Sequence, residues 1–237
     1  MTDHIVKSFD VELQKLATMI VQMGGIAEAQ LSSAIEAMVN RDQALATKVI
    51  DSDVTVDEIR TKADDLVVET LARRQPMATD LRFIVSVLRI ASEFERIGDY
   101  AKNVAKRSIA LSQSPVVKPT SSVPRMAVVV QSQIRQTIDA FEQGNAPLAD
   151  SVRAQDQQVD ELYTSLFREL LTYMMEDPRS ITACTHLLFI AKNIERIGDH
   201  ATNIAELVHY TVLGKMPQGE RPKGDNTAYS LSPGAGE

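Results

Sequence analysis

The sequence predicts an all-α protein made of two tandem, pseudo-symmetric three-helix bundles, with six long helices in all. The phrase ERIGD stands at residues 95–99 and again at 195–199, which indicates an internal duplication. Aromatic residues make up 5% of the chain and Trp is absent, a balance that suits helix packing better than a sandwich or barrel. Long stretches also place apolar residues alternately three and four positions apart, the spacing of a coiled-coil-like seam.

The repeat extends well beyond ERIGD. The segment LATKVIDSDVTVDEI at 45–59 aligns with LADSVRAQDQQVDEL at 148–162. The loops that follow them, RRQPMATDLR at 73–82 and MMEDPRSIT at 174–182, differ in sequence and length. Two halves of the chain are therefore copies of one plan.

The first half contains three helical segments in order. A helix is expected over about residues 5–39, and a break at 40–42 separates it from a second helix with an apolar seam over 45–66. Gln75 and Pro76 are expected to start the third helix, with Pro76 near its first turn, where its missing N–H costs least. The seam of that third helix runs over 87–111.

The second half repeats this order after a linker at 113–124 that is rich in Ser and Pro. A helix is expected over about 125–143, and a second seam runs over 148–166. Pro178 is expected to start the last helix, whose seam runs over 187–211. Because the loops are short, consecutive helices should be antiparallel.

These segments set the expected domain boundaries. Residues 1–112 form the first three-helix bundle, 113–124 the linker and 125–213 the second bundle. Residues 214–237 contain several Gly and Pro residues and are expected to be a disordered tail.

Composition and charge exclude several classes of protein. The net charge of −7 lacks the basic field of a nucleic-acid binder. No run approaches 18 consecutive apolar residues, and the N-terminal residues do not resemble a secretory signal, so the protein is not expected to be membrane-inserted. The single cysteine, Cys184, suits a reducing compartment. A cytoplasmic location is therefore predicted.

Acidic pairs four residues apart mark two helices in each half. Asp53 and Asp57 lie on the second helix, and Glu95 and Asp99 lie on the third. Their counterparts in the second half are Asp156, Asp160, Glu195 and Asp199. The register of the seam predicts that the pairs on the third helices face away from the core, whereas those on the second helices flank it. Gly98, beside Glu95 and Asp99, would remove side-chain bulk there.

Neighbouring antiparallel helices would bring the four carboxylates of each half together on one face. Such a group raises the pKa values of its members by mutual repulsion unless a cation neutralises it. Ligation by oxygen alone favours hard ions such as Mg, Ca, Mn or ferric iron. An alternative interpretation is an ordinary solvated face, in which the acids pair with neighbours such as Arg60, Lys102 and Lys106.

Catalytic motifs are not evident. The sequence has no Gly-rich phosphate loop and no Ser/His/Asp or Cys/His set. A ferritin-like di-iron centre would need His three residues after Glu95 and Glu195, where the chain has Gly98 and Gly198. The protein is therefore not expected to be an enzyme.

The duplication, RRQPMATDLR and both ERIGD copies resemble the PhoU family, the accessory proteins of phosphate-specific transport systems. The resemblance extends to about residue 213 and implies two symmetry-related three-helix bundles. It also implies multinuclear iron or other metal ions (Fe, Zn, Mn or Mg) bound by the eight acidic residues. The loop at 174–182 departs from the pattern because it lacks the RQP phrase.

The resemblance further implies a function. It predicts a negative regulator of the phosphate-starvation response that also modulates phosphate uptake. It would act as a cytoplasmic adaptor between the ATPase subunit of the phosphate ABC transporter and the sensor histidine kinase of a two-component system. Through these partners it would be peripheral to the inner membrane, and a homodimer is the expected assembly. The alternative is a metal-storage protein or a metal-dependent carboxylate-site enzyme.

Overall fold

A computed structural model describes residues 2–117 and 121–219, and the side chains within them from residue 9 onward. The described residues contain no strand, so the all-α prediction is confirmed. The helices are α1 (Thr2–Asn40), α2 (Gln43–Arg74), α3 (Ala78–Ser112), α4 (Val123–Gln143), α5 (Ala146–Glu176) and α6 (Ile181–Leu213), with a short 3-10 helix, η2 (Pro178–Ser180), before α6.

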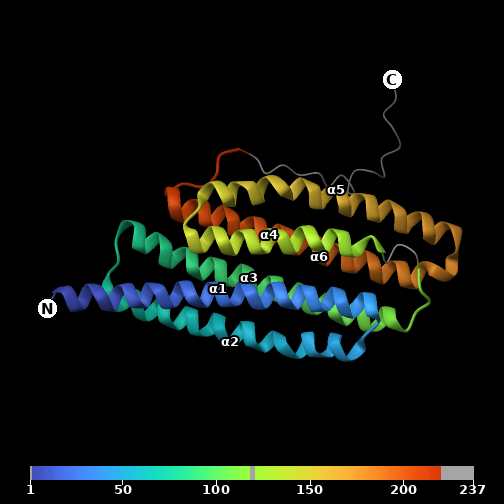
Figure 1. Cartoon of the computed structure of the whole chain (residues 1–237), viewed down its shortest axis with the longest axis horizontal. Helices are drawn as coiled ribbons and strands as arrows, with labels where there is room; N and C mark the ends of the chain where they lie inside the picture. Colours follow the sequence, from blue (N-terminus) through green and yellow to red (C-terminus); the bar gives the residue numbers. More distant parts are fainter. Residues whose placement is uncertain (1, 118–120, 220–237) are drawn as a thin grey trace, which may run out of the picture.

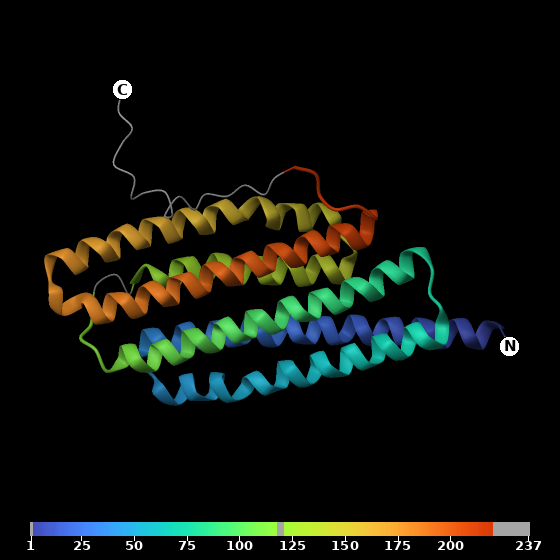
Figure 2. The same cartoon turned by 180° about the vertical axis from the view of Figure 1, so that it is seen from behind.

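The six helices form two three-helix bundles that lie side by side (Figure 1). Helices α1, α2 and α3 pack together in up-down-up order, and α4, α5 and α6 repeat the arrangement. The two bundles meet mainly through α3 and α6, which run antiparallel, with a smaller contact between α1 and α4 (Figure 2). The predicted pair of pseudo-symmetric bundles is therefore confirmed.

The second helices of the two halves begin with the same kind of cap, whereas the third helices begin differently. Asp42 caps α2 by accepting from the Leu45 N–H at 2.9 Å, and Asn145 caps α5 by accepting from the Leu148 N–H at 3.0 Å. The third helices begin differently: α3 starts at Ala78, whereas η2 precedes α6. Pro76 lies two residues ahead of α3, and Pro178 begins η2 just ahead of α6, so both prolines lie near the first turn of these helices, as predicted.

The core follows the predicted seams. In α3 every seam position from Val87 to Leu111 is buried, and in α6 burial extends from Leu187 to Val208. The apolar stripes therefore do what their spacing indicates, which is to bury one face of each long helix against its neighbours.

A pseudo-two-fold axis relates the two halves. Tyr100 and His200 occupy equivalent positions on α3 and α6, and their rings stack with centroids 5.4 Å apart. Because equivalent residues can meet only close to the axis, this contact locates it at the centre of the α3–α6 interface.

Parts of the expected linker and of the expected tail lie outside the described residues. Helix α4 begins at Val123, and residues 118–120 of the expected linker lie outside the described residues. The expected disordered tail also lies outside them from residue 220 onward. Over the described ranges, no helix is both long enough and apolar enough to cross a membrane.

Candidate functional site

The four predicted acids of the first half come together between α2 and α3. Asp53 is buried and Glu95 half-buried, whereas Asp57 and Asp99 are exposed. Partial desolvation raises the pKa of Asp57, and the charges of Asp53 and Asp99 raise it further. The pKa of Glu95 is also raised, first by burial and then by Asp99 and Asp57, against the opposing charge of Arg60. We refer to these four acids as the first acidic patch.

The equivalent acids of α5 and α6 form a second acidic patch: Asp156, Asp160, Glu195 and Asp199. Asp156, Asp160 and Glu195 are buried, and Asp199 is half-buried. Burial raises the pKa of Glu195 although Lys192 opposes it, and the charges of Asp199 and Asp160 add to the rise. The second patch is therefore deeper in the protein than the first.

The predicted outward orientation is wrong for part of this set. Glu195 lies in the interior, and Asp53 and Asp156 do more than flank the core. The reason lies in the seam of α2, which steps seven residues from Val49 to Val56 and leaves one core position to Asp53. The same step in α5 leaves a core position to Asp156. A missing apolar residue in an otherwise regular seam is the signal that could have identified these buried acids.

Basic side chains from the neighbouring helix neutralise much of the first patch. Lys102 forms an ion pair with Asp53 and lies 3.9 Å from Asp99. Arg60 of α2 reaches Glu95 of α3, with Nη1 3.1 Å from Oε2. Arg60 and Lys102 thus pair with these acids, as the alternative interpretation of the sequence expected. Most of these ion pairs join α2 to α3 and do not lie within one helix.

The second patch has a different set of partners. The positions of Arg60 and Lys102 are taken by the uncharged Tyr163 and Thr202. Thr202 donates from its hydroxyl to Asp156 at 3.2 Å, and Lys192 donates to Oε1 of Glu195 at 2.8 Å. The other oxygen of Glu195, Oε2, is buried and has no hydrogen-bond partner. An orphaned buried carboxylate oxygen is unfavourable, so of the two patches this one would gain more from a bound cation.

The ERIGD glycines admit a buried glutamine amide in each half. A Cβ on Gly98 would lie 3.0 Å from Oε1 of Gln30, and a Cβ on Gly198 would lie 3.3 Å from Oε1 of Gln133. Both glycines therefore make room for a buried side chain. The sequence had instead predicted that Gly98 lies beside a surface stripe of acids. Gln30 and Gln133 were not identified from the sequence, although they occupy equivalent positions on the first helix of each half.

The donor set suits a hard cation, but the geometry is not preformed. All eight acids offer oxygen, the ligand type that Mg, Mn and ferric iron prefer. In the described part of the chain, however, no three His, Cys, Asp or Glu side chains stand ready to hold one metal ion. A metal would have to compete with the ammonium and guanidinium groups that now contact these acids.

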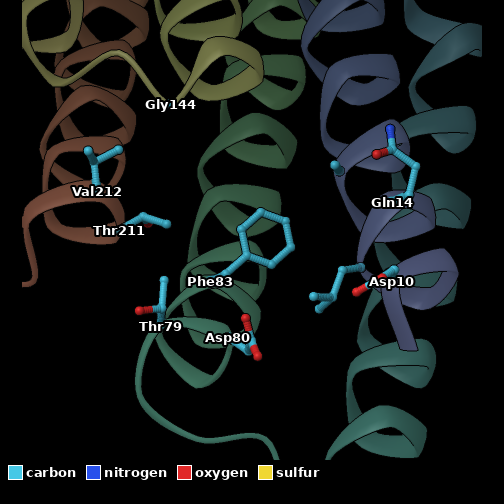
Figure 3. Close-up of a pocket in the computed structure, with 10 residues that line it drawn as sticks. Asp10, Gln14, Thr79, Asp80, Phe83, Gly144, Thr211 and Val212 are labelled. Carbon is cyan, nitrogen blue, oxygen red and sulfur yellow. The ribbon is translucent and has the colours of Figure 1, made fainter. Parts of the chain in front are cut away.

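A separate hollow of about 500 Å³ lies where the end of α6 approaches α1 and α3 (Figure 3). Phe83 and Val212 line it together with the carboxylates of Asp10 and Asp80. None of the eight predicted acids borders it, so it is distinct from both acidic patches.

Comparison with known proteins identifies the family. The model of the PhoU domain matches residues 20–108 and again residues 123–208, one match for each bundle. The chain belongs to the PhoU family. A PhoU relative from Rhizobium meliloti (strain 1021), named a phosphate-specific transport system accessory protein PhoU homolog, is 49% identical over 226 residues, which cover 95% of each chain.

Solved PhoU structures share the fold. The crystal structure of PhoU from Pseudomonas aeruginosa is 40% identical, with a TM-score of 0.84 over 87% of this chain and 100% of that one. The crystal structure of the phosphate transport system regulatory protein PhoU from Streptococcus pneumoniae is 27% identical, with a TM-score of 0.82 over 89% of this chain and 99% of that one. The PhoU architecture therefore accounts for nearly all of the described helices.

Proposed function

We propose that the protein is a cytoplasmic, non-enzymatic negative regulator of the phosphate-starvation response and a modulator of phosphate uptake. It links the ATPase subunit of the phosphate ABC transporter to the sensor histidine kinase of a two-component system. The observation that carries this proposal is the PhoU match across both bundles, together with relatives named as accessory proteins of phosphate-specific transport. Long helices with exposed faces also suit docking.

Deletion and copurification test the adaptor role. In phosphate-replete cells, deletion should leave the phosphate-starvation genes expressed, and the full-length chain should restore their repression. The tagged chain should copurify the transporter ATPase or the sensor kinase, and size-exclusion chromatography with light scattering should give the mass of a homodimer. Normal repression and uptake in the deletion strain would contradict the proposal.

We further propose that the acidic patches bind iron or another hard metal ion, with the second patch the tighter of the two. The buried, unpartnered Oε2 of Glu195 favours this, because a cation would satisfy it and relieve repulsion from Asp160 and Asp199. When bound, the ion would supply positive charge that locks α5 to α6. In the first patch Arg60 and Lys102 already supply such charge.

Elemental analysis of protein purified without chelators tests metal binding. Asp199→Ala should remove more metal than Asp99→Ala, since the second patch contains the buried, unpartnered Oε2 of Glu195. Unchanged metal content in both variants would exclude the patches as the site. This outcome would leave the adaptor proposal standing, because the copurification assay does not depend on it.

A further inference from the structure

A polar groove of about 470 Å³ lies between the C-terminal half of α3 and the N-terminal half of α6. Its functional side chains are hydrogen-bond donors and one aromatic ring: Asn103, Lys106, Arg107, His186, Phe189 and Asn193. No carboxylate lines it, although the chain carries a net charge of −7. The groove is therefore a local positive site on an acidic protein.

Arg107 is held in place without a counter-charge. Its guanidinium carbon lies 4.3 Å from the centroid of the Phe189 ring, and its Nη1 lies 3.4 Å from Nδ1 of His186. Among the described side chains, from residue 9 to 117 and from 121 to 219, no carboxylate forms an ion pair with Arg107 or Lys106. Burial lowers the pKa of His186, and the charge of Arg107 lowers it further, which favours the neutral ring that accepts from the guanidinium. A guanidinium fixed by neutral partners keeps its charge available to an anion.

The second half of the molecule provides an internal comparison. At the equivalent positions, Lys106, Arg107 and Asn193 are replaced by Glu206, Leu207 and Glu93. There Glu206 pairs with Arg153 at 3.1 Å, and Glu93 accepts from His200 at 2.6 Å. On the equivalent surface both acids are thus paired with a basic side chain. The unpaired positive charge of the groove is therefore found on one side of the molecule alone and does not follow from the duplication.

We propose that this groove binds a phosphorylated small molecule of nucleotide size. Guanidinium, ammonium, imidazole and amide donors together match the oxygens of a phosphoryl group. The volume falls in the range of roughly 300–1,000 Å³ typical of organic ligands, which is more than a single phosphate ion fills. Phe189, 47% exposed, offers apolar surface for the organic part. This site goes beyond the adaptor role and uses none of the eight acids.

Binding can be measured by isothermal titration calorimetry with the full-length chain in buffer containing EDTA, so that no metal on the acidic patches can recruit the anion. The probes are ATP, tripolyphosphate and inorganic phosphate. ATP should bind saturably, and more tightly than inorganic phosphate. Arg107→Leu should weaken ATP binding about tenfold or more, because it removes a charge-assisted pair. Leu is the residue that α6 carries at the equivalent position.

Two further variants separate site-specific from general effects. Lys106→Glu changes an exposed residue, so it should keep the fold, and it should weaken ATP binding about tenfold even if Arg107→Leu proves unstable. Arg89→Leu removes the same charge from an exposed position elsewhere on α3 and should leave binding within about twofold. Absence of saturable ATP binding, inorganic phosphate binding as tightly as ATP, or equal losses in Arg89→Leu and Arg107→Leu would each overturn the proposal.

Discussion

His200 on α6 donates from Nδ1 to Oε2 of Glu93 on α3 over 2.6 Å, which ties one bundle to the other. Asn203 donates to the same oxygen at 3.0 Å. Burial alone would raise the pKa of Glu93, but the hydrogen bonds from His200 and Asn203 and the charges of His200 and Arg96 lower it overall. The charged form of Glu93 therefore stabilises the contact between the bundles.

Glu93→Gln should destabilise the protein by about 1 kcal/mol at neutral pH, because a charge-assisted bond becomes a neutral one. An acid whose pKa is depressed by folding stabilises above its unfolded pKa, and that contribution is lost as pH falls through the folded pKa. The difference between Glu93→Gln and the parent protein should thus shrink as pH falls below the ordinary pKa of 4.5 and vanish once pH is below the lowered pKa of Glu93. Urea denaturation from pH 3 to 8 measures it.

The matched control is Glu58→Gln, an exposed glutamate on α2. It should change the free energy of unfolding by less than about 0.5 kcal/mol at any pH. A Glu93→Gln variant as stable as Glu58→Gln at pH 7 would show that the bond to His200 contributes nothing net.

Two adjacent glycines in the interior of α1 should respond to alanine in opposite directions. A Cβ on Gly24 would lie 2.6 Å from Ile138 and 2.9 Å from Phe94, whereas a Cβ on Gly25 would meet nothing within 4 Å. Gly24→Ala should therefore cost about 1–3 kcal/mol through overpacking. Gly25→Ala should gain about 0.5–1 kcal/mol from helix propensity. Thermal unfolding followed by circular dichroism compares them, and a stabilised Gly24→Ala would refute the close approach of α1 to α4.

The ion pair between Lys102 and the buried Asp53 should show strong coupling. Lys102→Met should destabilise by about 2 kcal/mol, less than the roughly 3–5 kcal/mol of a fully buried pair, because the Lys102 side chain is 27% exposed. Asp53→Asn in the Lys102→Met background should recover part of the loss, since it removes the unpaired charge. A double-mutant cycle by urea denaturation measures the coupling. Additive effects of the two substitutions would contradict this pairing.

Glu195→Gln should have opposite effects with and without metal. In EDTA it should stabilise the protein by about 0.5–1 kcal/mol, because it removes a buried charge that lies close to Asp160 and Asp199. With Mn²⁺ or iron added, the parent protein should gain melting temperature and the variant should not. Differential scanning fluorimetry with and without metal tests both parts. Destabilisation of Glu195→Gln in EDTA would show that its carboxylate is already adequately compensated.

Periodicity was sufficient to predict the fold. The seams identified α3 and α6 along nearly their whole length because a helix buried on one side must repeat apolar residues every three or four positions. The first residues of these helices were harder to predict from the sequence. Pro76 and Pro178 are compatible with a first helical turn and with the turn ahead of it, and local sequence does not separate the two.

The acidic patches were only partly predictable. The four-residue spacing predicted that Asp57 lies near Asp99, because both lie on the facing sides of consecutive helices. The depth of Glu195 and the counter-charge of Lys102 on Asp53 depend on how far the helices are rotated and on rotamers across the interface, which a helical wheel does not contain. The groove around Arg107 was missed for a similar reason, since helical spacing does not show that Arg107 on α3 and His186 on α6 lie together.

The stacking of Tyr100 on His200 has a consequence for assembly. Equivalent surfaces that meet antiparallel have the geometry of a two-fold dimer, yet here both belong to one polypeptide. Covalent linkage makes their encounter intramolecular, with an effective concentration of about millimolar or above, so the docking of the halves is insensitive to dilution. Linkage also frees each copy to mutate alone, and so Glu93 and Asn193 can differ at one and the same structural position.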